Sequence, residues 1–107
     1  MRLIDLDPGW VGAGGEGVTQ DGQPVPERHG VGIAFDCPCG VCGSRCYIPF
    51  ENPLDGGPAF VSDHPYWART GDTFETLTLT PSIQRRKVGE HGCTWHGFIR
   101  NGEIVHA

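Results

Sequence analysis

The chain has 107 residues, of which 37% are hydrophobic, and it carries a formal net charge of -5 at pH 7. This length suits one small domain. The acidic balance argues against binding to a nucleic-acid backbone, which requires clustered Lys and Arg, and no apolar run approaches the roughly 18 residues that span a membrane. With 17 Gly and 9 Pro, the composition predicts a mostly β, loop-rich domain of short antiparallel strands and hairpins.

The first 30 residues are rich in glycine and proline, and we expect an irregular lead-in with one short strand at its start. Asp5 and Asp7 interrupt the apolar stretch that a secretion signal would need, so we expect a cytoplasmic protein. In a reducing cytosol, cysteine clusters bind metal or do redox chemistry more often than they form disulfides. The domain itself is expected to span residues 31–107.

Three strands are predicted in the middle of the chain. Residues 31–35, VGIAF, are short, apolar and partly β-branched, which predicts a buried strand, and residues 46–50, CYIPF, are the expected return strand of a hairpin with the cysteine cluster at its tip. Residues 51–72 are turn-rich and long for a compact domain, which is typical of a functional or mobile loop. Residues 73–80, TFETLTLT, alternate in polarity and predict a third strand, which Pro81 ends.

The segment before the final alanine, WHGFIRNGEIVH, contains two short β runs on either side of Asn101-Gly102. Asn-Gly between alternating hydrophobic residues is the strongest short-range signal for a two-residue hairpin. The sequence therefore predicts a C-terminal β hairpin that turns at these two residues.

Cysteine spacing predicts a zinc site. Cys39 and Cys42 are separated by two residues and followed by Gly43, which suits a knuckle that turns two thiolates toward one ion. About fifty residues later, Cys93 and His96 repeat this spacing. Two such pairs are typical of a closed zinc site, with three cysteines and one histidine, that joins two hairpins.

The cluster holds more thiols than one zinc ion needs. Cys46 begins an apolar strand and is expected to be a buried structural thiol. We expect four ligands from a set of five candidates: Cys37, Cys39, Cys42, Cys93 and His96. Two alternatives stay open, a disulfide framework, which an odd number of cysteines disfavours, and a redox Cys-x-x-Cys, which normally lies where a strand meets a helix.

Other residues could carry chemistry. His64 follows Asp63 and could act as a general base, although an exposed loop histidine is the simpler interpretation. His91 could orient a metal ligand through a hydrogen bond or replace it. Ser82 could be a nucleophile, but no Ser-His-acid arrangement can be traced in the sequence, and a serine after a proline at a strand end more often caps a turn.

Three segments, HGVGIAFDCPCGVCG, YWARTGDTFETLTLTPSI and CTWHGFIRNGEIVHA, occur in this order. They resemble a family of small uncharacterised bacterial and phage proteins with a Cys-x-Cys-Gly-Cys-Gly cluster, a Trp before a strand, a Leu-x-Pro-Ser-Ile segment and a closing Cys-x-Ser-His-aromatic-x-Ile-x-Asn-Gly. The resemblance covers about residues 29–107. It implies zinc binding, and some members of the family are encoded beside ubiquitin-like conjugation genes, others in phage genomes.

Residue by residue, the resemblance matches Cys37, Cys39, Cys93, His96, Trp67, Pro81, Ser82, Ile83, Asn101 and Gly102. The chain departs from the family pattern at two places. Val41 is inserted, so the third cysteine of the pattern corresponds to Cys42, and Trp95 stands where the family has Ser before the His. The insertion is what creates the Cys-x-x-Cys spacing.

These observations predict a zinc-stabilised binding module of a bacterial or phage-infected cell, and the acidic charge favours a protein partner. A closed four-ligand site would make the zinc structural. Two alternatives are a metal-dependent hydrolase, in which an open zinc position holds water and His64, His91 or Glu90 is its base, and a thiol redox protein. The number of protein ligands on the zinc distinguishes the binding module, which has four, from the hydrolase, which has three.

Overall fold

The computed structural model describes residues 1–13, 28–40, 42–59, 65–86 and 94–107. Within these residues the chain is mostly β, as predicted, and no helix is long and apolar enough to cross a membrane. In chain order the elements are η1, a short 3-10 helix at Leu3–Leu6, and the strands β1 Gly9–Ala13, β2 Arg28–Asp36, β3 Arg45–Pro49, β4 Ala68–Thr70, β5 Thr78–Thr80, β6 Ile83–Arg86, β7 Thr94–Arg100 and β8 Glu103–His106.

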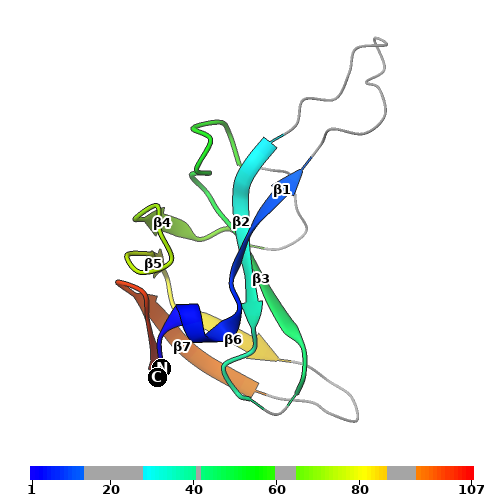
Figure 1. Ribbon diagram of the computed structural model, residues 1–107, viewed down its shortest axis with the longest axis vertical. Helices are drawn as coiled ribbons and strands as arrows, with labels where there is room; N and C mark the ends of the chain where they lie inside the picture. Colours follow the sequence, from blue (N-terminus) through cyan, green and yellow to red (C-terminus); the bar gives the residue numbers. More distant parts are fainter. Residues whose placement is uncertain (14–27, 41, 60–64, 87–93) are drawn as a thin grey trace.

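The strands form three small antiparallel sheets, in the orders β1-β2-β3, β4-β5 and β6-β7-β8. In Figure 1, the strands β1 and β2 lie above the paired strands β6 and β7, and the two ends of the chain lie side by side. The Met1 carbonyl accepts a hydrogen bond from the Ile104 amide at 2.8 Å, which attaches the start of the chain to β8.

The predicted hairpin around the cysteine cluster is confirmed. β2 and β3 pair from Gly32 with Pro49 to Asp36 with Arg45, and the cysteine cluster connects them. The start of the chain contributes β1, which pairs with β2. Residues 14–27 of the expected lead-in lie outside the described residues.

Short backbone contacts join the three sheets. Phe50 and Trp67 form an isolated parallel bridge between the end of β3 and the start of β4. The Gly102 amide donates to the Leu77 carbonyl at 2.9 Å, and the Leu3 amide donates to the Gly102 carbonyl at 2.8 Å. The turn between β7 and β8 is therefore fastened to both the β5 region and the 3-10 helix.

The prediction of one strand over residues 73–80 is wrong in its first half. Only Thr78–Thr80 forms a strand, β5, and Thr73 to Thr76 form a turn closed by a 3.2 Å hydrogen bond from the Thr76 amide to the Thr73 carbonyl. The two threonine hydroxyls also lie 2.7 Å apart. Threonine side chains that bond locally compete with strand pairing, which explains the shorter strand.

The turn-rich segment 51–72 contains a strand that the sequence does not predict. This strand, β4, pairs with β5 through Ala68 with Thr80 and Thr70 with Thr78. Its other edge is closed by a side chain, because Asn52 accepts from the Arg69 amide at 2.9 Å and donates to the Arg69 carbonyl at 2.8 Å. One asparagine thus replaces a pairing strand.

The C-terminal hairpin is confirmed, with β7 and β8 paired from Gly97 with His106 to Arg100 with Glu103. Asn101 and Gly102 have φ values of 48° and 75°, as a two-residue turn of this type requires. A Cβ at Gly102 would collide with the Glu75 carbonyl oxygen, so only glycine fits.

One hydrophobic core lies between the sheets. Its fully buried side chains include Ile33 and Phe35 of β2, Phe50, Leu77 and Ile99. Leu3 and Leu6 of the 3-10 helix pack in the same core, so the start of the chain takes part in it.

We predict that Asn52→Ala lowers the free energy of unfolding by about 1–2 kcal/mol, since two hydrogen bonds to the backbone of Arg69 are lost. Denaturant unfolding measures this change. Glu51→Ala, at the exposed neighbouring position, is the matched control and should leave the free energy of unfolding nearly unchanged. Equal stability of Asn52→Ala and the unmodified chain would show that the side chain does not hold β4.

Candidate functional site

The loop between β2 and β3 folds as a knuckle. The Cys37 amide donates to the Ser44 carbonyl at 2.9 Å, and the Gly40 amide donates to the Cys37 carbonyl at 3.1 Å. Gly40 and Gly43 have φ values of 75° and 66°, a backbone conformation that favours glycine. The glycines predicted to allow a knuckle are therefore where the chain reverses.

This knuckle brings three of the predicted ligands together. The sulfur atoms of Cys37, Cys39 and Cys42 all lie within 4.8 Å of one another. The Cys42 amide also points at the Cys39 sulfur, with nitrogen and sulfur 3.4 Å apart, an interaction that supports a thiolate. Three converging thiols, one of which accepts a hydrogen bond from a backbone amide, fit a metal ion. Cys93 lies outside the described residues.

Cys46 is buried, as expected for a structural thiol, with 3% of its surface exposed. Burial raises the pKa of this thiol, and the nearby Arg85 acts in the opposite direction. It lies at the start of β3, opposite Phe35. Cys46 thus lines the core side of the knuckle.

His96, the nitrogen ligand predicted from the sequence, lies in β7 and is exposed. Its Nε2 atom is 3.0 Å from the hydroxyl oxygen of Ser82, which is half-buried. With the imidazole proton on Nδ1, Nε2 accepts the hydrogen bond that the Ser82 hydroxyl donates. The structure therefore pairs His96 with a serine, and the group of three thiols does not include it.

Two features hold Ser82 in place. It precedes β6, whose residues Ile83 and Gln84 pair with Gly97 and His96 of β7. Its carbonyl oxygen accepts a hydrogen bond from the Trp67 indole at 3.3 Å. The serine is therefore held by strand pairing on one side and by an aromatic side chain from the start of β4 on the other.

A serine hydroxyl within hydrogen-bond distance of an imidazole is the arrangement of nucleophile and general base that acyl transfer requires. The base removes the hydroxyl proton as the oxygen attacks a carbonyl carbon. In the described part of the chain, no carboxylate makes a hydrogen bond with His96. The pair is thus a Ser-His dyad in which His96 lies on the exposed side of the central strand β7 and Ser82 directly precedes β6.

A family model described as "Bacterial ubiquitination-like system serine protease (BubE)" matches residues 17–107. The chain belongs to the BubE family. No curated protein and no solved structure matches it. The family description names a serine protease.

The sequence points to both Ser82 and His96 but does not predict that they are in contact. It favours Ser82 as a turn cap and His96 as a metal ligand, because their 14-residue separation carries no signal of contact. A weaker signal is present, since both residues match the Pro-Ser-Ile and Cys-x-x-His segments of the resemblance. The sequence does not reveal that these two segments pair as β6 and β7, and this pairing is what brings Ser82 to His96. The further candidates His64, His91 and Glu90 lie outside the described residues.

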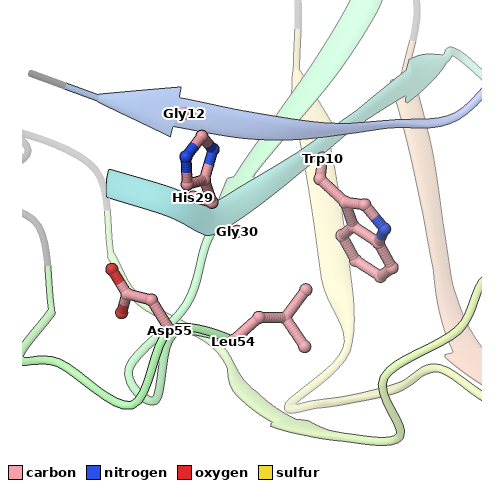
Figure 2. Close-up of a pocket in the computed structure, with 6 residues that line it drawn as sticks. All are labelled: Trp10, Gly12, His29, Gly30, Leu54 and Asp55. Atoms are coloured by element: carbon pink, nitrogen blue, oxygen red, sulfur yellow. The ribbon is translucent and has the colours of Figure 1, made fainter. Parts of the chain in front are cut away.

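A hollow of about 290 Å³ lies at the end of the β1-β2 pair that is far from the cysteine cluster. Figure 2 shows that its lining residues are Trp10, Gly12, His29, Gly30, Leu54 and Asp55. The Asp55 carboxylate at its rim is held by Arg28, whose Nε and Nη2 atoms each lie 2.9 Å from one of its oxygens. This ion pair joins β2 to the loop after β3.

The hydrogen bond from Arg28 and a second from the Gly57 amide lower the pKa of Asp55 from its ordinary 3.8 to about 2. Because the pKa is lower in the folded chain, the carboxylate stabilises the fold above pH 3.8, and this contribution is lost as the pH falls toward 2.

We predict that Asp55→Asn makes the free energy of unfolding less dependent on pH between about 4 and 2 than it is in the unmodified chain, as measured by denaturant unfolding at stepped pH. Asp72→Asn, at an exposed position in the loop before β5, is the matched control for the removal of one carboxylate. If the free energy of unfolding depends on pH in the same way in Asp55→Asn and in the unmodified chain, the lowered pKa of Asp55 is contradicted.

Proposed function

We propose that this BubE-family chain is a serine protease in which Ser82 is the nucleophile and His96 the general base. The 3.0 Å contact between the Ser82 hydroxyl oxygen and His96 Nε2 carries the proposal. The family description supports it, because it names a serine protease of a bacterial ubiquitination-like system. We therefore propose a protein of such a system as the substrate.

In the proposed reaction, the Ser82 oxygen attacks the carbonyl carbon of the scissile bond while His96 Nε2 takes the hydroxyl proton. The bond to the leaving amine then breaks, and His96 delivers that proton to the amine nitrogen. Water, activated by the same nitrogen, hydrolyses the acyl-serine ester, and the proton returns to Ser82. Each turnover cleaves one acyl bond and consumes one water.

The exposure of the dyad supports a macromolecular substrate. His96 is exposed, and the dyad lies on an open face of the β6-β7-β8 sheet. Small-molecule sites usually bury most of their ligand in a cavity. An open face can instead receive a chain segment of another protein, which agrees with the protein partner expected from the acidic charge.

We propose that the thiols of Cys37, Cys39 and Cys42 hold a structural zinc ion, with Cys93 as the fourth ligand. A bound zinc would supply folding free energy, on the order of 10 kcal/mol in small domains. Leaving His96 to Ser82 makes this a site of four cysteines, in place of the three cysteines and one histidine predicted from the sequence. Cysteines that bind a metal and form no disulfides are typical of a reducing cytoplasm.

We predict that an alkyl fluorophosphonate labels Ser82, because a serine activated by an adjacent base attacks phosphorus as it attacks a carbonyl. Intact-protein mass spectrometry and peptide mapping measure the adduct. Ser82→Ala should abolish labelling, and His96→Gln, which keeps a hydrogen-bonding side chain without a base, should slow labelling about 10³-fold or more.

Thr94→Ala is the matched control, since Thr94 is exposed on the same strand as His96 and lies two residues before it. It should be labelled at the rate of the unmodified chain. Labelling of Ser82 that survives His96→Gln unchanged would remove the base from the mechanism, and failure to label the folded, unmodified chain would contradict the protease.

We predict one zinc ion per chain by elemental mass spectrometry of the purified protein. Cys39→Ser should lose the metal and lower the midpoint of thermal unfolding, since the zinc contributes to folding. Cys46→Ala is the matched control and should retain the metal while losing some core packing. No metal in the unmodified chain, together with thiols that oxidise in pairs, would support the redox alternative instead.

A further inference from the structure

The exposed face of β7 carries an aromatic ring and a cation beside the dyad. Side chains alternate along a strand, so His96, Phe98 and Arg100 point to the same face. The rings of His96 and Phe98 have centroids 6.4 Å apart. The Arg100 guanidinium carbon lies 4.1 Å from the Phe98 centroid, in a cation–π contact.

Strand register places Phe98 across from the nucleophile. Ile83 pairs with Gly97 and Gln84 with His96, so the antiparallel pairing, continued by one residue, brings Ser82 opposite Phe98. Directly opposite residues of an antiparallel pair have Cβ atoms about 5 Å apart. A substrate carbonyl at Ser82 would therefore have the His96 imidazole on one side and the Phe98 ring on the other.

Arg100 differs in its contacts from three other arginines of the chain. Arg28 and Arg45 form ion pairs with aspartates, and Arg69 donates to backbone carbonyls. Among the residues that the structure describes, Arg100 forms no ion pair, and its recorded side-chain contact is the Phe98 ring. A guanidinium held against a ring keeps its N–H groups available, and their fork geometry matches a carboxylate.

We propose that Phe98 and Arg100 form a specificity subsite that binds the substrate chain next to the scissile bond and selects a carboxylate there. The inference rests on the protease function proposed above and adds the chemistry of its substrate. Phe98, which is half-buried, provides the apolar floor, and Arg100 pairs with the acidic side chain or chain end.

The distances between these groups locate the carboxylate along the substrate. An extended chain advances about 3.3 Å per residue. The separations from His96 to Phe98 and from Phe98 to Arg100 therefore place the guanidinium within roughly three residues of the cleaved bond. The subsite selects a substrate with Asp or Glu at one of these positions.

The experiment is a cleavage profile of the full chain on a library of proteome-derived peptides, read by mass spectrometry on both sides of each cut. We expect Asp or Glu to be enriched within three residues of the cut, with about tenfold higher kcat/KM for an acidic peptide than for its amide counterpart. Arg100→Gln should abolish this ratio, and Arg100→Glu should replace it with a preference for Lys or Arg.

Phe98→Leu keeps an apolar floor but removes the ring beneath the guanidinium, and it should reduce the acidic preference while cleavage continues. Arg100 is exposed at the end of β7, so its variants should keep the circular dichroism spectrum of the unmodified chain. Fluorophosphonate labelling of Ser82 in the Arg100 variants shows that the dyad itself is intact, because Arg100 does not contact it.

The outcomes separate the subsite from the protease. Labelling of Ser82 together with an acidic preference that Arg100→Glu reverses supports the subsite. Labelling with a cleavage profile that is the same in Arg100→Gln and the unmodified chain overturns the subsite and leaves the protease. Absence of labelling in the unmodified chain overturns both.

Discussion

The antiparallel pairing of β6 with β7 is the constraint on which the candidate site depends. It sets Gln84 opposite His96 and brings the Ser82 hydroxyl oxygen to 3.0 Å from His96 Nε2. A slip of one residue would exchange the two faces of β7, so that His96 would turn into the core and Trp95 into solvent. Gly97 helps to hold the register, since a Cβ there would collide with the Val105 carbonyl oxygen and the Trp95 ring.

The cysteine knuckle and the dyad are separate but connected. Arg85, in β6, reaches across to β3 and donates to the Arg45 carbonyl at 2.8 Å. Arg45 itself pairs with Asp36 at the base of the knuckle. An ion that stabilises the knuckle would thus stabilise the β2-β3 hairpin against which β6 packs. This arrangement lets a small core support the contact between Ser82 and the exposed His96.

Much of the fold could be predicted from local sequence. The β2-β3 hairpin with cysteines at its tip and the Asn101-Gly102 hairpin both follow from alternating hydrophobic residues next to turn residues. Strand β4 could not be predicted because its three residues carry no pattern of their own, and it is held by β5 and by the Asn52 side chain. Residues 73–76 resemble a strand because their alternation does not reveal the hydrogen bonds between Thr73 and Thr76.

The sequence by itself determined the features that depend on neighbours along the chain, namely the mostly β class, the two hairpins and the convergence of Cys37, Cys39 and Cys42. Short spacings and glycines with positive φ are sufficient for these. Only the tertiary structure decided that His96 faces Ser82, that Trp67 holds the serine backbone and that Arg100 lies over Phe98. The pairing of Ser82 with His96 depends on the register between β6 and β7, and register is set by core packing of the whole domain rather than by residues near the site.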